Sequence, residues 1–211
     1  MTQILTINLS ALSEVDYRKL YAICDEQRQK KADRYLRQED RLRCVAAGAL
    51  LRYAVFRVLG RQAFEVEAPP MKKPRLKDTP DFHFNLSHCG QWAVIAYDSA
   101  PVGIDVERIV WDSGKENIVC RFFAEDEQEY VFDGGEQSSA ERFFQIWTAK
   151  ESYLKYLGTG LLKSLTSFSV LQITTPQKHH YLLDGGYSMT LWAEGKPHSV
   201  EQLTVDQLLK C

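Results

Sequence analysis

Gly103-Ile104-Asp105-Val106-Glu107 is the stretch of sequence from which the fold and a functional site are best predicted. Apolar and acidic residues alternate along it, which predicts a β-strand with Asp105 and Glu107 on one face and Ile104 and Val106 on the other. Two carboxylates on one face repel each other unless a cation lies between them. The strand is therefore expected to carry a charged site on the face opposite its buried side.

A second stretch, Trp147-Thr148-Ala149-Lys150-Glu151-Ser152-Tyr153-Leu154-Lys155, has the pattern of a helix. Residues four apart share one face of a helix, so Glu151 stands beside Lys155 and adds a third carboxylate and an ammonium group. Hard oxygen ligands suit Mg²⁺, with Mn²⁺ as the alternative, and they leave room for phosphate oxygens. Together the two stretches predict chemistry on a phosphate or pyrophosphate, with the lysine balancing charge on a leaving group.

Lys150 falls in the middle of the apolar stripe of this helix. A buried ammonium group without a partner is costly, so Lys150 is expected to face a carboxylate or several carbonyl groups. Glu151 and Lys155 lie at the shoulder of the stripe, where a cleft can open. Either stretch taken alone is more often structural than functional, but their combination predicts that the helix is the wall of a site.

Composition limits the classes of protein to consider. The chain has 211 residues, of which 45% are hydrophobic, and its formal net charge is −2, which favours neither nucleic acid nor an anionic membrane as a partner. Its N-terminus lacks the pattern of a signal peptide and no long apolar stretch follows, so a cytoplasmic location is expected. The five cysteines are widely spaced and are expected to be reduced thiols.

The order of predicted elements indicates an α+β fold of two similar subdomains, residues 1–101 and 102–211. Each is expected to be a small, mostly antiparallel sheet with helices, the two related by a pseudo-twofold axis with the active site at their junction. The expected helices span about 14–24, 38–59, 117–132 and 141–157. The expected strands span 64–68, 82–86, 92–97 and 102–107, with others near Phe168, Tyr181 and Leu191 and a turn at 87–90.

The strand and the helix, about forty residues apart, resemble the paired signature of 4'-phosphopantetheinyl transferases. Three further segments are similar to the larger, Sfp-type branch of that superfamily: Lys73-Pro74, Phe84-Asn85-Leu86-Ser87-His88, and Arg121-Phe122-Phe123 with Glu127. The resemblance runs from Arg28 to about Leu161 and so covers most of the chain.

The resemblance implies transfer of the phosphopantetheine arm of coenzyme A to a serine of an apo acyl or peptidyl carrier protein, releasing adenosine 3',5'-bisphosphate. It implies a Mg²⁺ site made by Asp105, Glu107 and Glu151, with Lys155 stabilising the departing phosphate. The base that removes the serine proton is Glu151 or Glu127, and the sequence does not choose between them.

The resemblance also implies a set of residues that bind coenzyme A. Ser87, His88 and Lys73 are expected at its 3'-phosphate, with further candidates near the nucleotide at Arg28, Lys31 and Arg43. Structural alternatives stay open here, because His88 could belong to a turn and the basic residues could form a solvated helix face.

Two other functions use the same residues. A Mg²⁺-dependent phosphatase or nucleotidyl hydrolase could direct the carboxylates at water, and a scaffold without catalysis could keep the fold and bind carrier proteins. A scaffold would be expected to lack one of the metal ligands or the lysine. This chain has all three carboxylates and Lys155. Two subdomains in one chain can form the whole cleft, so a monomer is expected.

Overall fold

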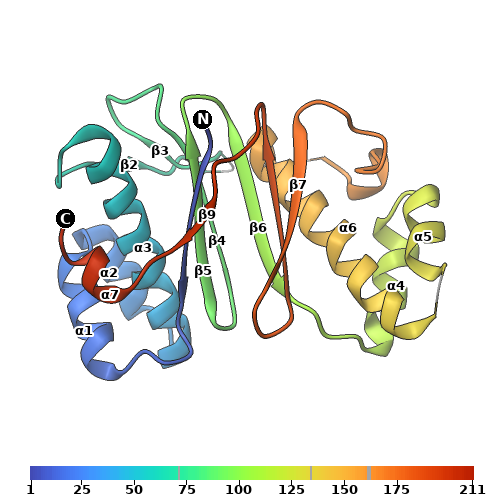
Figure 1. Cartoon of the computed structure of the whole chain (residues 1–211), viewed down its shortest axis with the longest axis horizontal. Coiled ribbons are helices and arrows are strands. Elements are labelled where there is room, and N and C mark those ends of the chain that lie inside the picture. Colours follow the sequence, from blue (N-terminus) through green and yellow to red (C-terminus); the bar gives the residue numbers. More distant parts are fainter. Residues whose placement is uncertain (71, 134, 161–162) are drawn as a thin grey trace.

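The computed structural model describes residues 1–70, 72–133, 135–160 and 163–211. It has the predicted α+β architecture with two subdomains. Figure 1 shows the strands in the middle of the molecule and the helices on its two outer sides. Apolar side chains fill three layers, one between each sheet and its own helices and one between the two sheets.

The first subdomain consists of β1 (Gln3–Asn8), α1 (Glu14–Ile23), α2 (Glu26–Asp33), α3 (Gln38–Leu59), β2 (Val66–Glu67), β3 (Arg75–Leu76), β4 (His83–Cys89) and β5 (Trp92–Asp98). The bounds of α3 are those predicted from its apolar pattern. The residue after it, Gly60, has a φ of 65°, in the left-handed region where helices commonly end. Asp25 caps α2, because its carboxylate accepts a hydrogen bond from the backbone N–H of Arg28.

The prediction of a turn at residues 87–90 is wrong. β4 continues through Ser87 and His88, which pair with Val94 and Ala93 of β5 in antiparallel register. The chain reverses only after Cys89, at Gly90, whose φ of 52° favours glycine. Ser87 and His88 therefore stand on a paired strand instead of a loop.

The second subdomain consists of β6 (Val102–Arg108), α4 (Ser113–Phe122), α5 (Glu125–Phe132), α6 (Glu136–Leu157), a 3-10 turn at Leu165–Ser167, β7 (Gln177–Leu183) and β8 (Tyr187–Ala193). The single helix expected over 117–132 is two helices, because Phe123 and Ala124 have extended backbones. The ring of Phe123 is buried and stacks on Phe143, which favours the break. The strand expected near Phe168 is absent from the described residues, since that residue follows the 3-10 turn.

The end of the chain returns to the first subdomain. β9 (Val200–Gln202) pairs with β1 in parallel, which gives a first sheet of order β4-β5-β1-β9 and a second sheet of order β6-β8-β7. The short helix α7 (Val205–Leu208) follows, and its buried Val205 and Leu208 belong to the core under α1 and α3. The predicted assignment of residues 102–211 to the second subdomain therefore needs a correction at its end only, because the last strand and helix pack with the first half.

The two predicted signature elements, β6 and α6, pack closely because of Gly103. A Cβ atom at this position would lie 2.0 Å from the Ser152 carbonyl oxygen and 2.4 Å from the Tyr156 nitrogen, both backbone atoms of α6. Backbone cannot move aside as a flexible side chain can, so only glycine fits. The close approach brings the carboxylates of β6 next to the side chains of α6.

Candidate active site

A cleft of about 680 Å³ lies between the two subdomains and is lined by residues of both. The wall from α2, α3 and β4 includes the basic residues Arg28, Lys31 and His88. The wall from β6 and α6 carries three carboxylates and an ammonium group, those of Asp105, Glu107, Glu151 and Lys155. The structure thus brings the two predicted stretches of sequence together at one cleft and sets basic groups opposite them.

Asp105 is almost fully buried in the acidic wall, with 4% of its surface exposed. Its Oδ1 accepts hydrogen bonds from Ser87 Oγ at 2.8 Å and from Lys155 Nζ at 2.6 Å. Its Oδ2 is buried and has no hydrogen-bond partner among the described residues. Since a buried carboxylate oxygen without a donor or cation is costly, Oδ2 marks a place where a ligand would be stabilised.

Glu107 and Glu151 flank Asp105, and the pKa of each is raised. Burial is the largest cause for both carboxyl groups, and the negative charge of Asp105 adds to it. No three His, Cys, Asp or Glu side chains in the described parts of the chain are already gathered around one point. The donors nevertheless fit Mg²⁺ or Mn²⁺ in kind, because all are hard oxygens and one of them is unpartnered. The metal site therefore stays a prediction that the chemistry of the wall supports.

Arg28 reaches the cleft over a glycine of α3. A Cβ atom on Gly48 would lie 2.8 Å from Arg28 Cγ and 3.0 Å from Cys24 Sγ. The absence of a side chain at Gly48 therefore makes room for the aliphatic part of Arg28, and the sequence alone gave no sign of this contact.

Two of the predicted basic residues do not line the cleft. Arg43 pairs with Asp40 at 2.6 Å and donates to the Gly90 carbonyl at 3.0 Å, so its guanidinium is already engaged. Lys73 donates to the Val102 carbonyl, and burial lowers the pKa of its ammonium group to about 8. Each of the two side chains is bonded to the protein itself, and the role of both at coenzyme A stays a prediction.

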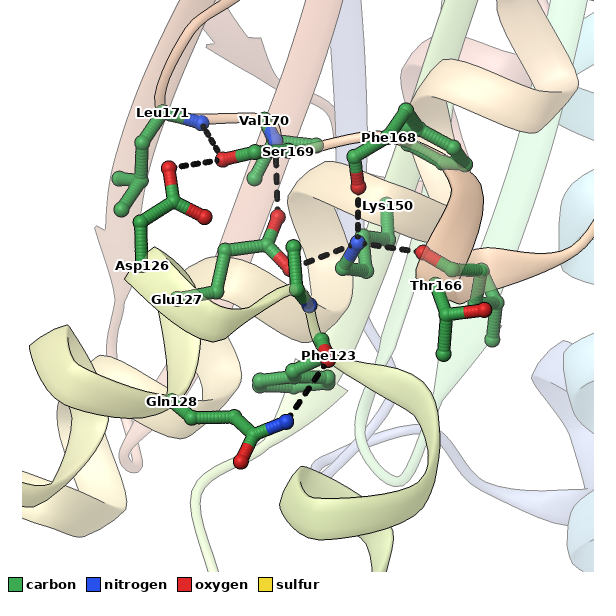
Figure 2. A network of polar contacts seen from close by, with 12 residues as sticks. Phe123, Asp126, Glu127, Gln128, Lys150, Thr166, Phe168, Ser169, Val170 and Leu171 are labelled. Carbon is green, nitrogen blue, oxygen red and sulfur yellow. Dashed lines mark hydrogen bonds and ion pairs between the residues drawn. The ribbon is translucent and has the colours of Figure 1, made fainter.

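Lys150 is fully buried, and Figure 2 shows the partners that surround it. Its Nζ lies 2.7 Å from Glu127 Oε2 and 2.7 Å from each of the carbonyl oxygens of Leu165 and Phe168. The same nitrogen lies 4.4 Å from the centre of the Phe168 ring, within range of a cation–π interaction. The prediction that Lys150 faces a carboxylate or several carbonyl groups is confirmed, and the structure provides both kinds of partner.

Glu127 is fully buried on the other side of this ion pair. Besides Lys150, its carboxylate accepts hydrogen bonds from the backbone N–H groups of Ala124 and Val170, each at 2.8 Å. It is not among the residues that line the cleft. This position corrects the expectation that Glu127 is a candidate base, because a carboxylate surrounded by protein donors cannot contact a substrate hydroxyl in the cleft.

Asn85 and Trp147 are among the cleft residues that were not predicted as site residues. Asn85 is buried and its Oδ1 accepts a hydrogen bond from the Ile104 N–H at 2.8 Å. The period of two along a strand places it on the face of Ser87, which could have indicated its position. Trp147 also lines the cleft, four residues before Glu151, so the helical period carried the same kind of signal.

Comparison with known proteins agrees with this geometry. The model of the 4'-phosphopantetheinyl transferase superfamily matches residues 101–204, and the model of a 4'-phosphopantetheinyl transferase N-terminal region matches residues 12–100. The 4'-phosphopantetheinyl transferase psf-1 of Bacillus pumilus is 30% identical over 222 residues, covering 96% of this chain and 94% of that protein. The chain belongs to the 4'-phosphopantetheinyl transferase superfamily.

Other relatives within this superfamily cover similar shares of the chain. The 4'-phosphopantetheinyl transferase Sfp of Bacillus subtilis (strain 168) is 29% identical over 215 residues, which cover 94% of this chain and 95% of Sfp. A second 4'-phosphopantetheinyl transferase of Bacillus subtilis is 32% identical over 161 residues, 75% of this chain and 71% of the relative. The matches to this superfamily therefore cover both subdomains.

Proposed function

We propose that this phosphopantetheinyl transferase moves the 4'-phosphopantetheine group of coenzyme A to a serine of an apo acyl or peptidyl carrier protein. A serine oxygen–phosphorus bond forms, the pyrophosphate oxygen–phosphorus bond breaks, and adenosine 3',5'-bisphosphate leaves. The observation that carries the proposal is a cleft with carboxylates and a lysine on one wall and basic groups on the other. This arrangement suits a polyphosphate substrate that must be held and neutralised at once.

In this proposal Asp105, Glu107 and Glu151 hold Mg²⁺ or Mn²⁺. The ion supplies neutralisation of the pyrophosphate oxygens when it is bound. Glu151 is the proposed base for the serine proton, because it lines the cleft, whereas Glu127 is enclosed by its own partners. Lys155 neutralises charge on the departing phosphate from the same helix face.

The phosphates of coenzyme A are proposed to contact Arg28, Lys31 and His88. All three lie on the wall opposite the carboxylates, and the two longer side chains offer charge-assisted hydrogen bonds. The neighbouring apolar lining, which includes Phe84 and Leu86, suits the adenine ring. Both walls come from one chain, which supports a monomer as the active form.

The chain contains free cysteines at positions 24, 44, 89, 120 and 211, in keeping with a reducing compartment such as the cytoplasm, which we propose as its location. None of the described helices combines the length and apolarity needed to cross a membrane.

Intact-mass spectrometry of apo carrier proteins tests the proposal directly. Each carrier is incubated with this protein, coenzyme A and Mg²⁺, and a parallel sample contains EDTA instead of the metal. We expect a gain equal to one phosphopantetheine group that EDTA abolishes. Coenzyme A cleaved without any gain on a carrier would indicate a hydrolase, and binding of carriers without cleavage would indicate a scaffold.

We expect Mg²⁺ to stabilise the protein more at about pH 7.5 than at about pH 4.5. The pKa values of Glu107 and Glu151 are raised above 4.5 in the folded protein. The folded state therefore keeps protons that the unfolded chain has lost, and the metal-free protein loses stability as pH rises through the raised values. A cation between the carboxylates offsets that loss. Melting curves with Mg²⁺ and with EDTA measure the difference, and a shift independent of pH would contradict it.

Gly48→Ala is expected to weaken coenzyme A binding by several-fold, while the crowding of Cys24 Sγ and the helix preference for alanine act on stability in opposite directions. The added methyl group displaces Arg28, whereas alanine inside a helix is favoured over glycine by about 0.5–1 kcal/mol. Calorimetric titration with coenzyme A measures the affinity, and Arg28→Gln provides the matched loss of charge. Equal affinities for Gly48→Ala and wild type would show that Arg28 does not need this space.

A further inference from the structure

The tips of two β-hairpins, one from each sheet, contact each other at one end of the molecule. Residues 90–91 join β4 to β5, and residues 184–186 join β7 to β8. In Figure 1 both turns lie at the lower end of the sheets, whereas the chain passes between the subdomains at the upper end, from β5 to β6 and from β8 to β9. The contact between the two turns is therefore at the end opposite both covalent connections.

Each turn contains a glycine that leaves room for a side chain of the other subdomain. A Cβ atom on Gly90 would lie 2.0 Å from the hydroxyl oxygen of Tyr187, and one on Gly185 would lie 2.4 Å from Gln91 Nε2. Both glycines also have a positive φ, 52° for Gly90 and 83° for Gly185, which other residues rarely adopt. The fit is thus reciprocal, since each subdomain provides the space that a side chain of the other fills.

Three hydrogen bonds join the same two turns. The backbone N–H of Gln91 donates to the Tyr187 hydroxyl oxygen at 3.2 Å. Gln91 Nε2 and Trp92 Nε1 both donate to the carbonyl oxygen of Asp184, at 3.1 and 3.0 Å. The rings of Tyr187 and Trp92 are buried in the apolar layer between the sheets. Apolar contact is not directional, so these hydrogen bonds and the reciprocal fit determine how one turn is placed against the other.

The contact is close to both walls of the cleft along the chain, but it lies outside the cleft lining. Gln91 follows His88, a residue of the basic wall, by three positions. Tyr187 pairs across the second sheet with Arg108, the residue after Glu107 of the acidic wall. Neither Gln91 nor Tyr187 lines the cleft. A shift of one turn against the other would therefore change the separation between the two walls.

We propose that Gln91 and Tyr187 are positioning residues, which hold the two walls of the cleft at the separation that coenzyme A requires. They act through β4 and β6 and do not touch the substrate. When only a fraction of the molecules has the correct separation, the apparent affinity for a ligand falls by that fraction. The inference rests on the proposed function for the identity of the ligand, but not for the placement of the subdomains.

The experiment uses the double variant Gln91→Ala with Tyr187→Phe, which removes the amide and the hydroxyl but keeps the buried ring. Electron–electron resonance measures the distance between spin labels at Lys19 of α1 and Glu116 of α4, both exposed, without ligand. The labels are introduced as non-natural amino acids, so the native cysteines stay unlabelled. Calorimetric titration measures coenzyme A binding. We expect a wider distance distribution and an affinity about three- to tenfold lower, equivalent to the loss of one or two hydrogen bonds.

Tyr130→Phe is the matched control. It removes a tyrosine hydroxyl that donates to Gln145 Oε1 at 2.7 Å, a hydrogen bond within the second subdomain. We expect it to keep the wild-type distance distribution and affinity even where its melting temperature falls, which separates the placement of the subdomains from general stability. Should the double variant fail to fold, Gln91→Ala alone changes a partly exposed residue and must also widen the distribution.

Three results would overturn the inference. They are an unchanged distance distribution in the double variant, a wider distribution with wild-type affinity for coenzyme A, and equal effects in Tyr130→Phe. Failure of the proposed function gives a different result. A wild-type protein that neither binds coenzyme A nor modifies a carrier, while the double variant still has the wider distribution, would overturn the function and support the role of the turns in placing the subdomains.

Discussion

Asp105→Asn is expected to lower the rate of phosphopantetheine transfer by at least about a hundredfold, the size of effect seen when one electrostatic contact to a transition state is removed. Asparagine keeps the shape of the side chain but not its negative charge. The change removes the only carboxylate of the cleft that has a buried oxygen without a partner, among the residues that the structure describes. It also deprives Lys155 of the anion 2.6 Å from its Nζ.

The measurement is the initial rate of carrier modification at saturating coenzyme A across a range of Mg²⁺ concentrations. Glu65→Gln is the matched control, because Glu65 loses the same kind of charge in an exposed pair with Lys77. Its rate should stay within about twofold of the wild type, since an exposed pair contributes little. A wild-type rate in Asp105→Asn, with a normal melting curve, would remove Asp105 from the proposed metal site.

Lys150→Met is expected to lower the free energy of unfolding by about 3–5 kcal/mol, the usual cost of removing one partner of a buried ion pair. Both side chains of the pair are fully buried, with Nζ and Oε2 2.7 Å apart. Methionine fills similar space but leaves the carboxylate of Glu127 without its cation and two carbonyl oxygens without their donor. The cost is in stability and not in chemistry, because the pair lies outside the cleft.

A double-mutant cycle in urea separates the ion pair from packing. Glu127→Leu alone leaves the ammonium group of Lys150 without its carboxylate and should destabilise the protein by a similar amount. The double variant Lys150→Met with Glu127→Leu should recover part of the loss, because no uncompensated charge remains. Strictly additive effects of the two single changes would show that the pair has no coupling energy.

Local sequence patterns predicted the helix α3 and the strand β6 correctly. The spacing of apolar residues and the following glycine predicted where α3 begins and ends. The alternation of residue types along β6 predicted which face carries Asp105. The misplaced turn had a local cause, since Ser87 to Gly90 contains residues common in turns but only Gly90 has a positive φ. Composition could not show that pairing with β5 continues to Cys89.

The parts of the site that were not predicted depend on contacts distant in sequence. The position of Lys150 in an apolar stripe showed that it needed a partner, but the partner lies 23 positions earlier, on a different helix. Glutamate can act as a base, so its residue type suggested a catalytic role. The buried ion pair with Lys150 shows that Glu127 is structural. The hydrogen bond of Asn85 to the edge of β6 likewise depends on a distant segment, although the period of two along β4 places Asn85 on the face of Ser87.

The return of the chain to its first sheet affects how the molecule can come apart. Residues 102–199 are in effect an insertion between two strands of one sheet, because β9 pairs with β1 and α7 contributes to the core beneath it. After a protease cut in the loop between β5 and β6, the second subdomain would therefore stay connected to the first sheet through the segment that joins β8 to β9. The two walls of the cleft would stay attached, and the first half, expressed alone with a boundary at residue 101, would lack the strand and helix that complete its own sheet and core.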